Sequence, residues 1–470
     1  MKINISKAIL SYIIVFILSF SYITPIIAIE DESSSSEATT ETNNSESSSE
    51  KKSRKEGEPP VFNDGETAIL IDAGTGNVLF EKESNKRMFP ASTTKIMTAL
   101  LAFEAVERGE ISLTTEIEIT PEMIDGLDPD GSSMSLKVGE IVSLDNLLKG
   151  MLIPSGNDAA CSIAAAVGKS QATFVDMMNS KAQALGCTDT HFANPDGLHD
   201  DNHYTTAADM AKIARAAMQY FDFRNIVDCA HIKIPPTNMS PERYFINTNG
   251  LLSTMRYPNF AYKGATGIKT GYTQKAGNCL VSSVKRDGME FIGVVYGGKE
   301  VANSHKGTID MFNYGFENYS PVTPVSKGDM LYDIKVKQSS GSDSLVLSAN
   351  SSVTVIVPNG TNADDVKLKP NLPKYITAPV NAGDVIGTMT VTLHGQELSS
   401  FDLIASSSVK RSFFWPVMAV GDFLWENKIT RTIICLILIA ALTFVVIFII
   451  AIYKNIKAAK RNRRNKYRRR

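Results

Sequence analysis

The sequence predicts an α/β catalytic domain with helices and an antiparallel sheet, followed by a small all-β domain and one transmembrane helix. Residues 61–318 begin and end with strand-like segments and carry helical segments between them. Residues 319–408 hold short β runs and no long helical pattern, and an uncharged apolar stretch follows near the C-terminus. These three observations divide the 470 residues into two folded domains and an anchor.

The N-terminal 60 residues differ in composition from the rest. Lys2 and Lys7 precede the apolar stretch Ala8–Ala28, a pattern that predicts a secretory signal peptide over residues 1–28. The bulky Ile26 near the expected cleavage site leaves an uncleaved anchor as the alternative. Residues 29–60 are rich in Ser, Glu, Thr and Asn, and we expect a disordered linker because they offer little apolar surface to bury.

The catalytic domain, residues 61–318, should open with a β-hairpin and close with three strands. Its helices are expected from periodicity, the first running from Ser92 to about Gly109. The opening strands can pair with the closing ones, so distant segments would complete one sheet. The expected strands are Thr67–Asp72, Asn77–Glu81, Gly267–Thr273, Asn278–Lys285 and Met289–Gly297, and the further helices are Leu144–Met151, Asp158–Val167, Ala172–Leu185 and Thr206–Gln219.

The C-terminal region predicts a membrane anchor. After the small β-rich domain (319–408) and a juxtamembrane connector (409–431), residues 432–453 hold no charge, and 22 residues at about 1.5 Å each cross a bilayer core of about 30 Å. Residues 454–470 carry ten Lys or Arg and no acid. The positive-inside rule then places this tail in the cytoplasm and the catalytic domain outside, in a single-pass protein of the cell membrane.

Charge argues against a nucleic-acid ligand. The chain carries −2 overall, and because the tail supplies ten cations and the first 28 residues two, the outer part carries about −14. The five cysteines are too widely spaced for a zinc site or a disulfide scaffold, and small buried residues are the simpler interpretation. His191, His199 and His203 lie in a loop-rich region, but nothing else marks a metal site, so we expect no metal and no cofactor.

Three short motifs occur in chain order. In Ser92-Thr93-Thr94-Lys95, a helix would place the hydroxyl and the amine one turn apart on one face, where a neutral lysine could take the serine proton. Ser155-Gly156-Asn157 falls on a break between two helices, where a hydroxyl can relay protons and an amide can orient a lysine. Each motif alone is common in ordinary turns and capped helices.

The third motif, Lys269-Thr270-Gly271, falls on an expected strand. Lys269 would add positive charge to the site, which lowers the pKa of a second lysine and attracts a carboxylate. Gly271 leaves space for a ligand along the strand, and the main-chain N–H of Tyr272 could bind an oxyanion. Ser-x-x-Lys, Ser-Asp-Asn and Lys-Thr-Gly occur together in β-lactamases and penicillin-binding proteins, and here Gly156 stands where the aspartate would be.

With these motifs, the chain resembles the low-molecular-mass penicillin-binding proteins that act as serine-type D-alanyl-D-alanine carboxypeptidases. Longer segments extend the similarity, namely 89–98, 147–150, 154–159, 194–198 and 203–207. The resemblance implies a penicillin-binding-protein/β-lactamase-like catalytic domain. It also implies that Ser92 is acylated by peptidoglycan stem peptides and by β-lactam antibiotics.

The resemblance assigns further roles. Lys95 and Ser155 would act in catalysis beside Ser92, and Asn157, Lys269, Thr270, Gly271 and Tyr272 would bind substrate. Lys299 stands where some relatives place an arginine that binds a carboxylate, and it is a weaker candidate.

Three alternatives stay open at this point. A serine β-lactamase would need a group that activates the deacylating water, and residues 158–268 offer Glu242 as their only glutamate. A catalytically silent peptidoglycan-binding protein would not require both lysines. A D,D-endopeptidase acting on cross-links would use the same chemistry as the carboxypeptidase.

Overall fold

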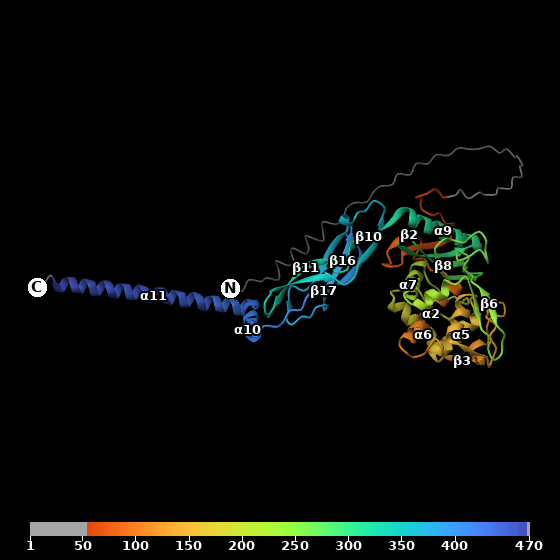
Figure 1. Cartoon of the computed structure of the whole chain (residues 1–470), viewed down its shortest axis with the longest axis horizontal. Coiled ribbons are helices and arrows are strands. Elements are labelled where there is room, and N and C mark those ends of the chain that lie inside the picture. Colours follow the sequence, from red (N-terminus) through yellow and green to blue (C-terminus); the bar gives the residue numbers. More distant parts are fainter. Residues whose placement is uncertain (1–53, 468–470) are drawn as a thin grey trace, which may run out of the picture. The chain divides into compact units, whose positions relative to one another are not determined.

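The computed structural model describes residues 54–467 and contains the helices and strands that position the motifs (Figure 1). The predicted signal peptide and most of the predicted linker lie outside the described residues. Arg54, at the end of that linker, donates from Nη2 to both oxygens of the Glu317 carboxylate, at 2.8 and 2.6 Å. The described end of the segment therefore contacts the catalytic domain.

One antiparallel five-stranded sheet organises the catalytic domain, in the order β2-β1-β9-β8-β7. The first two strands pair with the last three through β1 and β9, where Leu70 lies opposite Gly293. The prediction that distant segments complete one sheet is confirmed, and β7 forms an edge of it. The strands are β1 (Thr67–Asp72), β2 (Val78–Lys82), β7 (Ala265–Thr273), β8 (Gly277–Arg286) and β9 (Met289–Gly298).

Helices cover both faces of this sheet (Figure 1). On one face lies α9 (Val301–Asn318), a helix that the sequence analysis did not predict, although Glu300 and Asn303 form a capping box at its start. The other face carries α7 and, beyond it, the remaining helices. These are α2 (Lys95–Glu107), α3 (Pro121–Ile124), α4 (Leu144–Leu152), α5 (Asn157–Gly168), α6 (Gln171–Ala184), α7 (Ala207–Ala217) and α8 (Phe221–Val227).

Alanine-rich helices allow this layer to pack closely. Helix α2 is buried over most of its length, with Ala99, Ala102 and Ala105 all at most 1% exposed. Such a helix has no wide polar face, so we attribute its stability to tertiary packing on all sides. Two small hairpins complete the domain, formed by β3 (Glu116–Glu118) with β4 (Ile141–Ser143) and by β5 (His231–Ile234) with β6 (Arg243–Ile246).

The first motif differs from the prediction in where the α-helix begins. Residues 91–94 form a 3-10 turn, η1 (Ala91–Thr94), and the α-helix begins only at Lys95. The tighter turn still brings positions i and i+3 to the same side, because a 3-10 helix has about three residues per turn.

The second folded part is all-β, as predicted. A six-stranded sheet has the order β14-β16-β17-β12-β11-β15, and β10 pairs with β13 beside it. Its separate core includes Val355, Val391 and Leu403. The strands are β10 (Tyr319–Val325), β11 (Met330–Lys337), β12 (Ser344–Ala349), β13 (Val353–Pro358), β14 (Lys367–Asn371), β15 (Ile376–Thr377), β16 (Val385–Leu393) and β17 (Gln396–Ala405), with one 3-10 turn, η2 (Ala363–Asp365).

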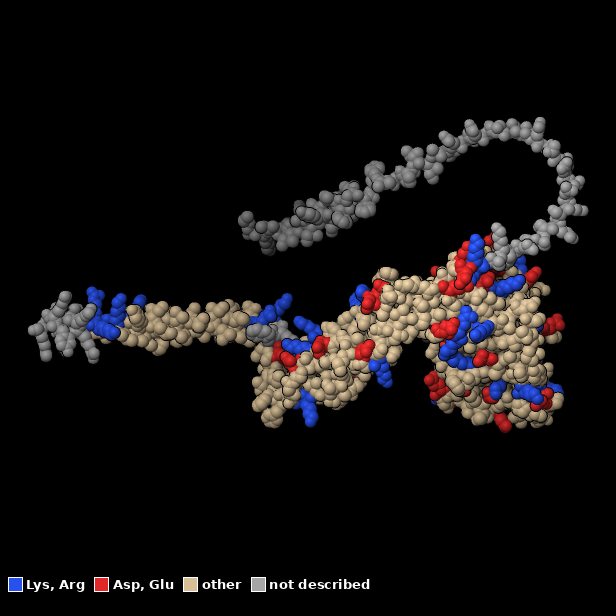
Figure 2. Space-filling model, turned by 45° about the horizontal axis from the view of Figure 1, so that its top comes forward, with Lys and Arg blue, Asp and Glu red and all other residues tan. Residues whose placement is uncertain are grey.

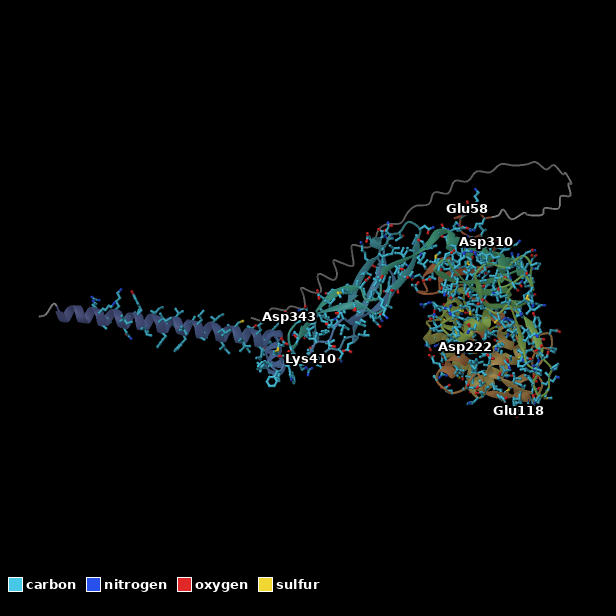
Figure 3. The ribbon with its side chains drawn as sticks, viewed as in Figure 1. Glu58, Glu118, Asp222, Asp310, Asp343 and Lys410 are labelled. Carbon is cyan, nitrogen blue, oxygen red and sulfur yellow. The ribbon has the colours of Figure 1, made fainter. Side chains whose placement is uncertain are left out.

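The C-terminal part is helical. After α10 (Trp415–Glu426), α11 (Lys428–Tyr467) contains a 34-residue stretch, Lys428–Arg461, with a mean hydropathy of 3.5 in its most apolar window. Among the described residues this is the one helix that is long and apolar enough to cross a membrane. Figure 2 shows uncharged side chains along its middle and Lys and Arg at both ends, and Figure 3 shows its side chains projecting freely.

Candidate active site

The three motifs meet at the junction of η1, α5 and β7. The Nζ atom of Lys95 lies 2.9 Å from Ser92 Oγ and 2.7 Å from Asn157 Oδ1. Gly271 on β7 packs directly against η1, because a Cβ atom there would lie 3.0 Å from the Ser92 nitrogen. Residues separated by more than 170 positions thus form one site.

The third partner of Lys95 is a main-chain atom. Lys95 Nζ donates to the Asp196 carbonyl oxygen at 2.6 Å, so Ser92, Asn157 and Asp196 together occupy the three donor positions of an ammonium group. In the sequence, residues 194–198 were one of the segments similar to the penicillin-binding proteins, and Asp196 had no predicted role. No pattern in the sequence reveals it, because the contact uses a backbone oxygen that every residue has.

Burial decides the protonation of Lys95. The side chain is fully buried, and desolvation lowers the pKa of Lys95 to about 8, against opposing effects of Asp196, Cys161 and Asp158. A neutral amine has two hydrogens and one lone pair. It can donate to Asn157 and Asp196 and still accept the Ser92 hydroxyl hydrogen.

Ser155 occupies the bend between α4 and α5, as predicted. Its backbone has a left-handed φ of +72° and its side chain is 4% exposed. The bend has little room for a larger residue at Gly156, where a Cβ would lie 2.9 Å from the Gly150 carbonyl oxygen. Ser155 is therefore held in a tight bend two residues before Asn157, although the three hydrogen bonds of Lys95 go to other groups.

The third motif lies on the β7 edge strand. Lys269 is fully buried, and desolvation together with Lys95 and Arg256 lowers its pKa. Its Nζ donates to the Thr270 carbonyl oxygen at 3.0 Å, and the Thr270 hydroxyl donates to Thr248 Oγ1 at 2.6 Å. Tyr272, two residues further along β7, has a side chain that is 62% exposed.

The histidines and cysteines noted in the sequence lie in packed or hydrogen-bonded surroundings. His203 is buried and bonds to Thr94 and Ala193, while His199 stacks edge-on against Phe89. All five cysteines are free, and three of them are buried: Cys161, Cys187 and Cys279. Within residues 54–467 no group of three His, Cys, Asp or Glu side chains could hold a metal ion.

Two known protein families match successive parts of this chain. The D-alanyl-D-alanine carboxypeptidase family matches residues 54–300, and the C-terminal domain of penicillin-binding protein 5 matches residues 319–411. The chain is 31% identical over 353 residues to the D-alanyl-D-alanine carboxypeptidase DacF of Bacillus subtilis, covering 75% of this chain and 87% of that protein. It is 32% identical to DacA of Escherichia coli, over 75% of this chain and 85% of that one.

Solved structures show the same fold. Penicillin-binding protein 5 from Haemophilus influenzae superimposes with a TM-score of 0.61 at 28% identity, covering 73% of this chain and 97% of that structure. A peptidoglycan synthesis regulatory factor, PBP3, from Streptococcus pneumoniae gives a TM-score of 0.63 at 25% identity, covering 73% and 98%. The predicted fold class is confirmed.

Proposed function

This chain belongs to the D-alanyl-D-alanine carboxypeptidase family, and on that premise we propose that Ser92 is its nucleophile and Lys95 the base that activates it. The protein is a serine-type D-Ala-D-Ala carboxypeptidase, a hydrolase that acts through an acyl-enzyme and is acylated by β-lactams. The observation that carries the residue assignment is the contact of 2.9 Å between Ser92 Oγ and the Nζ atom of Lys95, whose side chain is fully buried.

Acylation begins when neutral Lys95 takes the Ser92 proton. The Ser92 oxygen attacks the carbonyl carbon of the penultimate D-alanine, and the C–N bond to the terminal D-alanine breaks. The leaving nitrogen needs a proton, which returns from the Lys95 ammonium, with the Ser155 hydroxyl as a relay. Asn157 and the Asp196 carbonyl hold the ammonium in place while it carries this proton.

The oxyanion would be bound by two main-chain donors, the N–H groups of Ser92 and Tyr272. The support is the close approach of β7 to η1, which puts the backbone at Gly271 against the Ser92 nitrogen. Fixed donors stabilise the developing negative charge because they need no reorganisation during the reaction. A main-chain donor at position 272 does not depend on the side chain, so a tyrosine there is compatible with this role.

Lys269 and Thr270 would bind the terminal carboxylate of the substrate. Burial makes a charged Lys269 costly in the free enzyme, and an incoming carboxylate would offset that cost. Water then hydrolyses the acyl-enzyme on Ser92 and releases the shortened stem peptide. The same groups would receive a β-lactam, whose carboxylate stands in for that of D-alanine.

We further propose that α11 anchors the protein in the cell membrane with the catalytic domain outside. Helix α11 has the length and composition of a membrane span, and the basic residues that follow its uncharged segment favour the cytoplasmic side. Peptidoglycan stem peptides and β-lactams are then met on the outer surface. The domain boundaries given above remain predictions.

The full-length chain in detergent tests the proposal. It is incubated with a pentapeptide ending in D-Ala-D-Ala, and free D-alanine is assayed beside Ser92→Ala as the matched variant. We expect release by the wild type and none by the variant, and labelling of Ser92 by a fluorescent penicillin. Release by Ser92→Ala at the wild-type rate would overturn the assignment, and release only from cross-linked dimers would identify an endopeptidase.

A further inference from the structure

The turn Asn194–Leu198 packs directly onto the segment that carries Ser92 and Lys95. Thr98 Oγ1 donates to the Pro195 carbonyl at 2.6 Å, and Lys95 Nζ donates to the next carbonyl, that of Asp196, also at 2.6 Å. At Gly197, which has a φ of +87°, a Cβ would lie 2.0 Å from the Ala91 carbonyl oxygen. Only glycine allows so close an approach, so the turn lies directly against η1.

His203 ties both sides of this contact together. The Ala193 N–H donates to His203 Nδ1 at 3.0 Å, and His203 Nε2 lies 2.8 Å from Thr94 Oγ1. Because Nδ1 is an acceptor, the neutral ring carries its hydrogen on Nε2 and donates it to the threonine. One ring therefore links the residue before the turn to the residue immediately before Lys95.

The surroundings keep this ring neutral. His203 is 2% exposed, and the Phe192 ring packs edge-on against it with centroids 5.6 Å apart. Burial lowers the pKa of His203 to about 3. The titratable groups that face it are Asp200, His191 and His199 from its own loop and Lys95 from α2. At neutral pH His203 therefore carries no charge and donates a hydrogen bond from Nε2 to Thr94 Oγ1.

We propose that His203 is a positioning residue for the reaction: it holds the Asn194–Leu198 turn on η1 and α2, so that the Asp196 carbonyl orients the Lys95 amine toward Ser92. The inference rests on the proposed roles of Ser92 and Lys95. His203 acts through Thr94 and Ala193 and touches no reacting atom. Without this link, the turn can move away from Lys95 and admit water to the buried amine.

Two half-mimics and one full deletion test the link. A glutamine amide nitrogen can take the place of Nε2 and keep the bond to Thr94, whereas an asparagine oxygen can take the place of Nδ1 and keep the bond to Ala193. Phenylalanine keeps a ring and removes both bonds. The variants are therefore His203→Gln, His203→Asn and His203→Phe, all in the full-length protein in detergent.

We measure kcat, KM and the pH dependence of kcat/KM for D-alanine release. For His203→Phe we expect kcat to fall about 10- to 100-fold while KM stays within about 2-fold, because a misplaced base slows chemistry more than binding. The acid limb of kcat/KM should move to higher pH as Lys95 is rehydrated. His203→Gln and His203→Asn should each recover part of the lost kcat.

A control separates positioning from general destabilisation. Phe174→Leu alters a fully buried core residue on α6 and removes none of the hydrogen bonds of His203 to Thr94 and Ala193. It should lower the melting temperature and leave the pH profile unchanged. A wild-type pH profile in folded His203→Phe would overturn the proposal. The proposal would also be overturned if the loss of kcat in the three histidine variants simply followed their loss of melting temperature, on the same line as Phe174→Leu.

The same assays distinguish failure of the His203 positioning role from failure of the proposed roles of Ser92 and Lys95. Penicillin labelling and Ser92→Ala are run on the wild-type histidine background. If Ser92 is labelled and required, but His203→Phe is unaffected, only the positioning role fails. If Ser92 is neither labelled nor required, the assignment of Ser92 and Lys95 fails, and the histidine proposal fails with it.

Discussion

Lys95 Nζ lies 2.9 Å from Ser92 Oγ, and its two other hydrogen-bond partners are the Asn157 amide oxygen and the Asp196 carbonyl, neither of which carries a charge. A carboxylate in either place would hold the lysine as an ammonium, because an opposite charge at contact raises the pKa of an amine. Neutral partners orient the amine and leave burial free to lower its pKa. The pair is therefore arranged for proton abstraction rather than for an ion pair.

Lys95→Arg should abolish turnover. A guanidinium keeps its proton at any assay pH, so it cannot accept one from Ser92. We expect kcat/KM for D-alanine release to fall by about 10²- to 10⁴-fold, the usual contribution of a general base. The acylation rate with a fluorescent penicillin should fall by a similar factor. A variant that is folded and retains more than a tenth of the wild-type rate would show that another group is the base.

The pH profile of the wild type should report Lys95. Its pKa is lowered to about 8, and the neutral form is the active one. Below that pH the ammonium has no lone pair for the Ser92 proton, so kcat/KM should rise with pH and level off above about 8. Stopped assays from pH 6 to 10 in one mixed buffer measure this. An activity that falls as pH rises from 7 to 9 would contradict the assignment.

Asn157→Asp should shift that profile. The new carboxylate would lie where Oδ1 now accepts from Lys95 at 2.7 Å, at almost unchanged volume. It would favour the ammonium, raise the pKa of Lys95 and move the acid limb of kcat/KM to higher pH, with activity at pH 7 reduced about 10-fold or more. Asn157→Ala is the matched variant, since it removes the hydrogen bond without adding charge. An identical profile in both variants would mean that Asn157 acts only on the substrate.

Gly271→Ala should separate β7 from η1. The added methyl group would lie 3.0 Å from both the Pro90 oxygen and the Ser92 nitrogen, so the strand must move by a few tenths of an ångström. Such overpacking costs about 1–3 kcal/mol of stability, and it displaces the backbone at the proposed oxyanion site. We expect penicillin acylation to slow at least about 10-fold.

Gly74→Ala is the control for the Gly271 variant. Its Cβ would meet only the Asp72 side chain, at an ordinary contact distance of 3.5 Å. Acylation in Gly74→Ala should equal that of the wild type. If Gly271→Ala also acylates at the wild-type rate, the close contact between β7 and η1 has no part in catalysis.

Removal of α11 should release the protein from membranes. A chain ending at Asn427 lacks the whole apolar stretch Lys428–Arg461. We expect the full-length protein to resist carbonate extraction and require detergent, because about 20 apolar residues insert into a bilayer almost irreversibly. The shortened chain should appear in the soluble fraction with unchanged D-alanine release. Membrane retention of the shortened chain would assign the anchor to residues before 428.

The sequence by itself determined the fold class, the order of the three motifs and the apolar C-terminal segment that is long enough to cross a membrane. Periodicity and turn residues located the five strands of the catalytic sheet and five of its helices within a few positions, because the apolar runs that become the buried centres of β8 and β9 are visible in the local sequence. It also supplied Ser92, Lys95, Asn157 and Lys269 as candidate site residues, since a proposed nucleophile, base and cation require particular side chains. It missed α9, whose buried face mixes glycine, serine and histidine with few large apolar residues.

The tertiary structure alone decided how the site is held. The Asp196 carbonyl oxygen is a backbone atom and has no sequence signature, yet it accepts one of the three hydrogen bonds of Lys95 Nζ. The protonation of Lys95 depends on burial by segments far away in the chain, which no local pattern records. His203 could be read from the sequence only as one of several histidines, because its tautomer and its partners, Thr94 and Ala193, exist only after the turn has packed on the helix.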